Sequence, residues 1–303
     1  MNEQLSIASI SDLISRIDHA YEKFQGKGQL WWRGQPNFSH KLVPGVFRKN
    51  KSEDIDISPR HPFNERSLIN RFMLKAPMRF KQVPENDDYA RWLILMQHYR
   101  LPTRLLDWTE SPLIAFYFSL RFDFKRKNKH KHEGALYALS PHILNETQTS
   151  NPALFSPWDE GYSLPLIRDA FGQQTGVADL KNVIAIGPSH FDIRPMVQLS
   201  GFTLHRNRNP IDKIGNNDSF LIKFKVIYDR PLRNALLEDL KHLGITGTSI
   251  FPDLENLALD VKNTNFKPDG PLRPSDDSSD RPNGPSGSFI SPSGTPVRRT
   301  QST

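Results

Sequence analysis

The sequence predicts a mixed α+β fold. Helical spacing of apolar residues dominates the first part of the chain, whereas alternating apolar patterns come mostly later. The two patterns do not alternate regularly, which argues against a doubly wound parallel sheet. Of the 303 residues, 37% are hydrophobic and 24% are charged. The chain can therefore bury a sizeable core, as one large domain or two small ones.

The individual elements follow from the spacing of apolar residues. The first is an amphipathic helix at SDLISRIDHAYEKF, with Ser9 or Ser11 as its N-cap. The other predicted elements are, in chain order, a strand over 29–35, helices over 64–81 and 88–99, a strand over 103–108 that leads into a helix ending at 120, strands over 134–139, 196–205 and 220–227, a helix over 230–243 and a strand over 245–251. Weak periodicity and many polar residues predict long surface insertions at 48–62 and 146–182.

The composition changes at residue 263. From there to residue 303 the chain is dominated by Pro, Ser, Gly and Asp. Such a segment cannot bury enough apolar surface to offset the entropy lost on ordering, so a disordered tail is expected. The predicted organisation is thus an N-terminal helical segment over 1–28, one domain over 29–262 and the tail over 263–303.

Composition also limits the classes of function. The N-terminus lacks the basic start and apolar stretch of a signal peptide, and the longest apolar run, 113–120, is too short to span a membrane. The absence of cysteine excludes disulfides, thiolate metal sites and a cysteine nucleophile. We therefore expect a cytoplasmic protein with no membrane association and no metal.

The charge of the chain suggests an anionic partner. The net charge is +7 and the isoelectric point about 9.5, which fits an anionic ligand or nucleic acid. Lysines on solvated faces account for this mild excess equally well. The basic run FKRKNKHKHE, 124–133, is likewise either a solvated loop or a loop that contacts phosphate.

The first motif is LWWRGQPN, which places two tryptophans, an arginine and a glycine in succession. On a strand, Trp31 and Arg33 share one face while Trp32 is on the other. Arg33 can lie against the Trp31 indole and keep its fork free for an oxyanion, and Gly34 exposes backbone to a flat ligand. The alternative is that Arg33 forms a structural pair with a carboxylate.

The second motif is QHYRLPTRLLDWTESPLIAFYFSL, residues 97–120. Ser111 followed by proline predicts a helix start, so the strand leads to a turn that carries Thr109 and Ser111 at a helix N-terminus, where an anion is favoured. Asp107 is expected to pair with Arg104 or Arg100 and fix the turn. We expect Arg33, Thr109 and Ser111 to meet at one cleft.

Other chemistries find no support in the sequence. The chain has no Walker loop, no G-x-G-x-x-G, no G-x-S-x-G elbow and no H-E-x-x-H. His98 ends an apolar helix, where a hydrogen-bonded core histidine is more common than a catalyst.

Together these motifs resemble the FRG domain family, named for an aromatic-Arg-Gly motif. Here that motif is Trp32-Arg33-Gly34, followed by LVPGVFR at 42–48, and the resemblance runs in family order over about 29–260. The stretch 97–120 is the most specific match. Arg100 stands where the family usually has glycine.

A more distant similarity is to the arginine–serine–glutamate class of ADP-ribosyltransferases, which implies an ADP-ribosyltransferase-like mixed sheet core and NAD as substrate. In that class the arginine contacts the NAD backbone, and the main chain of the residue after it binds nicotinamide. A motif that carries a hydroxyl group supports the site, and a carboxylate late in the chain stabilises the ribosyl cation. The implied catalytic residues are Arg33, Thr109, Ser111, Asp253 and Glu255. The implied NAD-binding residues are Trp31, Arg33, Gly34, His98, Arg104 and Asp107.

The function that the resemblance implies is an NAD-dependent ADP-ribosyltransferase-like activity on an unidentified target, for which nucleic acid is one option. Two alternatives stay open. One is a non-catalytic module that binds nucleotide or nucleic acid in the same basic pocket, and the other is an interaction domain without a ligand. Asp253 and Glu255 are also typical first-turn acids of a helix that starts at Pro252.

Overall fold

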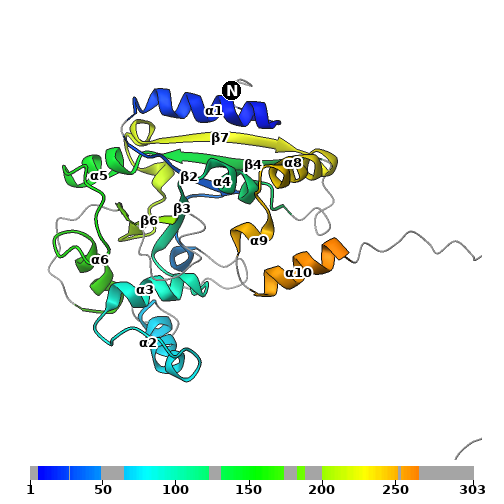
Figure 1. Cartoon of the computed structure of the whole chain (residues 1–303). Coiled ribbons are helices and arrows are strands. Elements are labelled where there is room, and N and C mark those ends of the chain that lie inside the picture. Colours follow the sequence, from blue (N-terminus) through cyan, green and yellow to red (C-terminus); the bar gives the residue numbers. More distant parts are fainter. Residues whose placement is uncertain are drawn as a thin grey trace, which may run out of the picture. The chain divides into compact units, whose positions relative to one another are not determined.

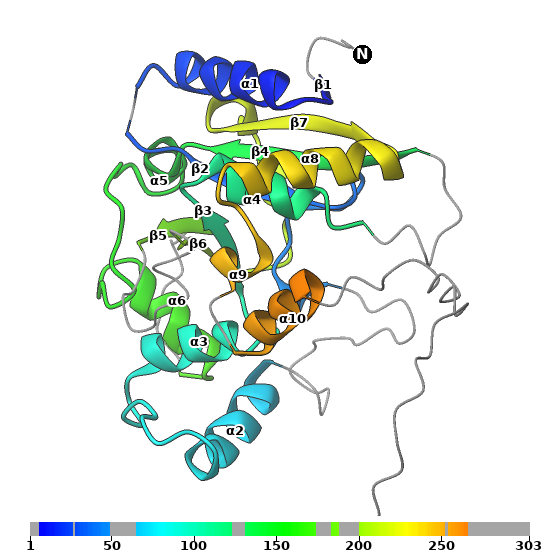
Figure 2. The ribbon, with the colours of Figure 1, turned by 45° about the vertical axis from the view of Figure 1, so that its right-hand side comes forward.

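We describe the fold from a computed structural model, which covers residues 6–26, 28–48, 65–122, 131–173, 183–187, 200–251 and 254–265. Its centre is a mixed seven-stranded sheet in the order β1-β7-β4-β2-β3-β6-β5 (Figures 1 and 2). The strands are β1 (Ser6–Ile7), β2 (Trp31–Gln35), β3 (Leu105–Thr109), β4 (His132–Leu139), β5 (Val183–Ile186), β6 (Ser200–His205) and β7 (Leu221–Tyr228). All neighbouring pairs are antiparallel except β1 with β7.

Helices surround this sheet, so the predicted α+β class is confirmed. They are α1 (Ile10–Lys23), α2 (Glu65–Lys75), α3 (Tyr89–His98), α4 (Pro112–Ser119), α5 (Pro141–Thr149), α6 (Ser163–Ala170), α8 (Arg230–His242), α9 (Gly247–Ile250) and α10 (Leu254–Asn265). Short 3-10 helices are η2 (Gly45–Phe47), η3 (Ala76–Met78), η4 (Ile211–Lys213) and η5 (Asn217–Ser219). Among the described helices, none has the length and apolarity needed to cross a membrane.

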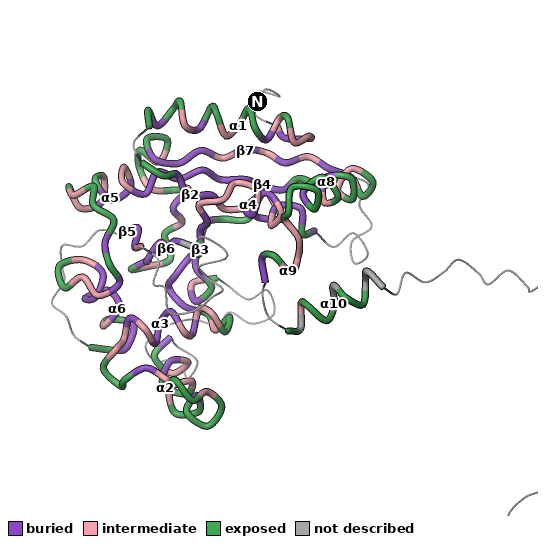
Figure 3. Tube along the Cα trace, viewed as in Figure 1, coloured by how far each residue is buried: buried purple, intermediate pink, exposed green. Residues whose placement is uncertain are grey.

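The sheet buries both of its faces, as the buried strands in Figure 3 show. One face carries a single core that includes Trp31, Trp108 and Tyr137, closed by α5 and by residues 211–221. The other face carries two cores. The first lies between α1, α4 and α8 and the strands β1, β7, β4 and β2, and includes Trp32. The second lies between α2, α3 and α6 and the strands β3, β6 and β5.

The boundary between the two cores on that face falls between β2 and β3. Trp32 lies opposite Thr109, and within the described sheet this is the only residue pair that joins the two strands. By contrast, β2 pairs with β4 along its whole length, and β3 pairs likewise with β6. The sheet is therefore nearly split in its middle. On the face that carries two cores, α4 covers one side of this split and α3 covers the other.

Two element predictions are wrong. Residues 245–251 do not form a strand but contain the short helix α9, because Thr246 and Ser249 form a capping box. The segment 146–182 is no plain surface insertion, since it contains the end of α5 and the helix α6, which buries Leu164, Leu166 and Ile167. The helix α6 has no side-chain N-cap to mark its start, whereas the equally short α4 begins at Ser111 followed by proline.

Other predicted boundaries shift. The helix expected over 64–81 ends at Lys75 and continues as η3. In the run 124–133, His132 and Glu133 belong to β4, and His132 is a buried residue whose ring stacks on Phe122 at 3.4 Å between centroids. Residues 49–62, 123–130, 174–182 and 196–199 lie outside the described part of the chain.

The helix α10 extends to Asn265, so it includes the first residues of the predicted tail. The chain divides into two compact units, Met1–Val261 and Lys262–Thr303. The tail from residue 266 onward lies outside the described residues.

Candidate functional site at the split in the sheet

A cavity of about 530 Å³ lies over the split between β2 and β3. Its walls come from β2, β3, β6, the C-terminal part of α3, the helix α4, Phe251 and α10. Of the residues expected at a site, five line it: Arg33, Gly34, His98, Asp107 and Thr109. Trp31, Arg104 and Ser111 are not among the lining residues. The volume is typical of small-molecule sites.

Arg33 lies in the gap between the two strands. Its backbone pairs with Tyr137 of β4, and its Nη1 donates to the backbone carbonyl of Asp107 on β3. The guanidinium thus occupies a place where strand pairing would otherwise satisfy that carbonyl. Its Nε is buried and has no hydrogen-bond partner in the described structure.

The charge of Arg33 is held in a poorly solvated place. Desolvation lowers the pKa of Arg33 to about 10, helped by the nearby Arg48 and opposed by Asp107. At neutral pH the side chain still carries its charge. No described carboxylate forms an ion pair with it, so the expected alternative of a structural Arg–carboxylate pair does not hold within the described chain. The guanidinium of Arg33 therefore retains N–H groups that can donate to a bound anion.

Asp107 is the one acidic residue among the described residues that line the cavity. Its carboxylate accepts from Gln97 Nε2 at 2.9 Å through both oxygens, and Gln97 Oε1 accepts in turn from the Thr103 hydroxyl. The expected pairing of Asp107 with Arg104 or Arg100 is therefore wrong. A side-chain relay from Thr103 through Gln97 orients this carboxylate.

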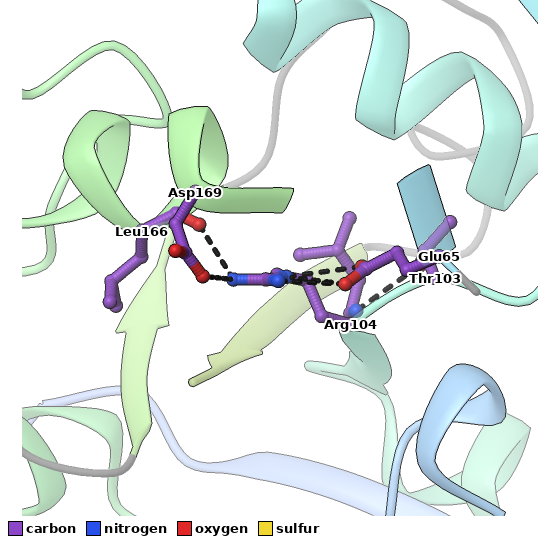
Figure 4. A network of polar contacts seen from close by, with 6 residues as sticks. Glu65, Thr103, Arg104, Leu166 and Asp169 are labelled. Atoms are coloured by element: carbon purple, nitrogen blue, oxygen red, sulfur yellow. Dashed lines mark hydrogen bonds and ion pairs between the residues drawn. The ribbon is translucent and has the colours of Figure 1, made fainter. Parts of the chain in front are cut away.

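Arg104 binds elsewhere, in the buried network of Figure 4. It forms an ion pair with Glu65 at 2.7 Å and another with Asp169 at 3.0 Å, and its Nη1 also donates to the carbonyl of Leu166. Arg104 is 5% exposed. Its donors are used in holding α2 and α6 to the start of β3, so its expected role in NAD binding is not supported by its position.

Thr109 and Ser111 have different surroundings. The Thr109 hydroxyl accepts from the Ser111 backbone N–H at 3.1 Å, and the Ser111 hydroxyl accepts from Ile114 N–H at 3.3 Å as the N-cap of α4. The prediction of this helix start is confirmed. Ser111 acts as a cap outside the cavity, so of the expected trio only Arg33 and Thr109 meet there.

Gly34 is required for close packing rather than for an open backbone surface. A Cβ at this position would lie 1.7 Å from the carbonyl oxygen of Ala115 and 2.6 Å from the amide nitrogen of Ser119. Gly34 therefore lets β2 approach α4 to backbone contact. Gly34 and Ala115 both line the cavity as well.

Trp31 also departs from its expected role. Its ring lies on the backbone of Gly201, where an added Cβ would be 2.6 Å from Trp31 Cζ2. It is 1% exposed, within the core on the far face of the sheet. No ring contact between Trp31 and Arg33 occurs in the described structure, so Trp31 is a core residue.

A buried polar chain lies next to Arg33. Trp108 Nε1 donates to the Thr203 hydroxyl at 3.0 Å, and that hydroxyl is 3.2 Å from His205 Nε2. His205 is fully buried, and its Nδ1 has no partner in the described structure. Burial, and then the charge of Arg33, lower the pKa of His205 to about 3. The imidazole is therefore neutral at neutral pH.

Further lining residues were missed by the sequence reasoning. Arg121, which follows α4, lies 5.7 Å from the ring centroid of Tyr117 and 5.9 Å from that of Phe251. Phe251 in turn meets Phe118 edge-on at 5.8 Å. The signal for Arg121 was its place directly after the quoted motif, whereas nothing local distinguished Phe251.

Arg100, which also lines the cavity, has a left-handed backbone. Its φ is 62°, in the left-handed region that glycine occupies at little cost. The turn after α3 thus has a backbone shape that favours glycine, and Arg100 adds an exposed cation to the cavity lining.

The two acids expected late in the chain remain without a described geometry. Asp253 lies outside the described residues, and so does the side chain of Glu255. The backbone of Glu255 belongs to the first turn of α10, not to a strand. The next residue, Asn256, lines the cavity. In the described part of the chain no group of three or more His, Asp or Glu residues could hold a metal ion.

Comparison with known proteins gives one finding. The model of the FRG domain family matches residues 28–130. This range contains β2, α3, β3 and α4, and hence Arg33, Gln97, Asp107 and Thr109 of the cavity. No curated protein and no solved structure matches the chain significantly. The chain contains an FRG domain, and the matched part supplies the centre of the cavity.

Proposed function

We propose that the FRG domain binds NAD in this cavity and transfers its ADP-ribose unit to an acceptor. The observation that carries the proposal is the desolvated guanidinium of Arg33, which keeps unused donors beside a carboxylate in a cavity of ligand size. A charged guanidinium in such a place favours an anion that binds through two oxygens. The pyrophosphate of a dinucleotide is an anion of this kind.

The remaining lining suits the other parts of NAD. Phe118, Phe202 and Phe251 are aromatic residues of the cavity lining, against which flat nicotinamide and adenine rings can pack. Arg100 and Arg121 add positive charge at the same cavity. These features fit an anionic ligand with rings better than a neutral metabolite.

The chemistry we propose needs one carboxylate near the ribose. The C–N glycosidic bond breaks and its electron pair goes to the nicotinamide nitrogen, which leaves neutral. The ribose C1′ gains oxocarbenium character, which a carboxylate stabilises. An acceptor oxygen or nitrogen then bonds to C1′ and loses its proton to solvent. Asp107, oriented by Gln97, is one candidate for this carboxylate, and Glu255, next to cavity-lining Asn256, is the other.

The test is calorimetric titration with NAD, thermal melting and an assay of nicotinamide release. We expect Arg33→Lys to melt close to wild type but to bind NAD about 1–3 kcal/mol more weakly, because lysine cannot form the bidentate contact. Arg230→Lys, an exposed change outside the cavity lining, should bind as wild type does. In the same assay, Asp107→Asn or Glu255→Gln should abolish release while NAD still binds.

Each result has a clear meaning. If Arg33→Lys melts far below wild type, Arg33 is structural. If wild type binds NAD without releasing nicotinamide, the domain is a non-catalytic nucleotide-binding module, which the same cavity lining also supports. If wild type binds no NAD at all, the proposal is wrong.

A further inference from the structure

A basic and partly apolar surface lies beside the cavity, on α2, η3 and the end of α3. Residues 66–81 contain five basic side chains and no acidic one. We call four of them, Arg71, Lys75, Arg79 and Lys81, the basic strip. All four are exposed. Figures 1 and 2 show α2 at the edge of the molecule next to α3, and Figure 3 shows exposed stretches along it.

The charges of the basic strip are not used within the described fold. None of the four side chains forms an ion pair with a described carboxylate. The only acid on α2, Glu65, is buried against Arg104 and does not offset them. Unpaired cations gathered on one surface attract a polyanion.

Aromatic rings connect the basic strip with the cavity. Arg79 donates to the carbonyl of Lys75, and the next residue, Phe80, meets Tyr99 edge-on at 6.1 Å between centroids. The Tyr99 ring is also 4.9 Å from that of His98, which lines the cavity. Tyr99 is 53% exposed, and the cation that follows it, Arg100, lines the cavity as well.

We infer that this surface binds single-stranded nucleic acid and guides it toward the cavity. The basic strip would contact the phosphates, and the exposed ring of Tyr99 would stack on a base, which is how single strands are bound without sequence readout. A duplex would contact the same charges, but its bases are already stacked on one another and cannot use Tyr99. The binding itself needs no NAD. Its role in presenting the acceptor rests on the proposed transferase function.

An anionic membrane is the competing partner, because Leu74 and Met78 protrude from the same surface, 78% and 81% exposed. We favour nucleic acid because the charges lead to an exposed aromatic ring and a cavity. A flat lipid surface would use neither.

The experiment measures fluorescence anisotropy of a labelled single-stranded oligonucleotide with the full chain in the absence of NAD, over a series of salt concentrations. We expect the triple variant Lys75→Gln, Arg79→Gln, Lys81→Gln to lower the salt slope of log K by about 2, because each lost phosphate contact accounts for about 0.7. Its affinity at 0.1 M salt should fall on the order of a hundredfold.

The control is a triple variant with the same loss of charge elsewhere, Lys41→Gln, Lys213→Gln, Arg230→Gln, all at exposed positions. It should bind nearly as wild type does. Tyr99→Ala should weaken binding about fivefold or more, whereas Tyr99→Phe keeps the ring and should restore it. All variants are expected to melt as wild type does.

Three outcomes would overturn the inference. Equal losses in the two triple variants would mean that only net charge matters. Equal or tighter binding of a duplex would remove the role of Tyr99. Binding of vesicles that contain anionic lipid, with loss in the triple variant of the basic strip and no binding of the oligonucleotide, would assign the surface to membranes. Because NAD is absent throughout, failure here leaves the proposed NAD binding to be judged by its own titration.

Discussion

Arg33 and His205 have perturbed pKa values for the same physical reason. Desolvation is the largest cause for both, and the charge of Arg33 adds to the effect on His205. A desolvated arginine still keeps its proton at neutral pH, whereas a desolvated histidine loses it. The fold therefore places a charged guanidinium near a neutral imidazole, and acid should disturb this arrangement.

His205 is expected to make the fold acid-sensitive. Its pKa is about 3 in the folded chain and near the ordinary histidine value of 6.5 when unfolded, so between these values the unfolded chain binds a proton that the native state does not. The contribution of His205 is fully present above pH 6.5 and is lost as pH falls, by about 1.4 kcal/mol per pH unit. Lowering the pH to 5 should cost about 2 kcal/mol of unfolding free energy.

Urea unfolding at pH 7 and pH 5 tests this, with His205→Gln as the comparison. Glutamine stays neutral and can still accept from Thr203, so the variant should lose less stability between the two pH values than wild type does. Other titrating groups act in both proteins and cancel. The same loss in both would show that His205 is not the acid-sensitive group.

Single residues also show where prediction from sequence succeeds. The strand alternation correctly placed Trp31 and Trp32 on opposite faces, and the Ser–Pro pair correctly located the start of α4. The predicted partners of Arg104 and Asp107 were wrong. Arg104 pairs with Glu65 and Asp169, and Asp107 accepts from Gln97, and all three partners come from other elements. Long-range pairing leaves no trace in local spacing.

At the scale of elements, the contact between β2 and α4 holds one wall of the cavity in place. It depends on Gly34, since a Cβ there would meet the backbone of α4 at 1.7 Å. Backbone atoms cannot rotate away as the end of a flexible side chain can. The strand and the helix would have to separate.

Gly34→Ala is therefore expected to destabilise the fold by about 3 kcal/mol or more, as overpacking against backbone does. Gly215→Ala is the matched control, because a Cβ there meets nothing within 4 Å, and it should change the unfolding free energy by no more than about 0.5 kcal/mol. Chemical denaturation of the two variants measures the difference. A Gly34→Ala protein as stable as wild type would refute close packing as the reason for this glycine.

Elements differed in how well the sequence predicted them. The amphipathic helix α1, with its Ser9 cap, and the long strand β7 have enough residues to show their period. The two-residue β1 and the four-residue β5 do not, and the eight-residue helix α6 lacks a side-chain N-cap that would mark its start. Residues 245–251 resembled a strand because Ile245, Ile250 and Phe251 are apolar, but the local capping box of Thr246 and Ser249 determines a helical turn.

At the scale of the whole molecule, the cavity results from how the sheet is covered. Two cores share one face, and they meet where β2 and β3 hold together by a single residue pair. The FRG match ends at residue 130, yet Phe202 of β6, Phe251 and Asn256 also line the cavity. The later strands and helices are therefore needed to complete a site whose centre the matched part supplies.

The same reasoning gives a prediction for the C-terminal segment. All described strands of the sheet and all described lining residues of the cavity lie before residue 262. Residues 266–303 contain only five large apolar residues (Phe266, Leu272, Phe289, Ile290 and Val297), too few to bury a core of their own.

A chain that ends at Asn265 should therefore unfold cooperatively, with a melting temperature within about 2 °C of the full chain, since a change of 1 kcal/mol in a domain this large shifts it by about 2–4 °C. Differential scanning calorimetry of the two chains, followed by titration with NAD, makes the comparison. Loss of the cooperative transition would mean that residues after Asn265 contribute to the fold, and loss of NAD binding with an unchanged transition would mean that they contribute to the site.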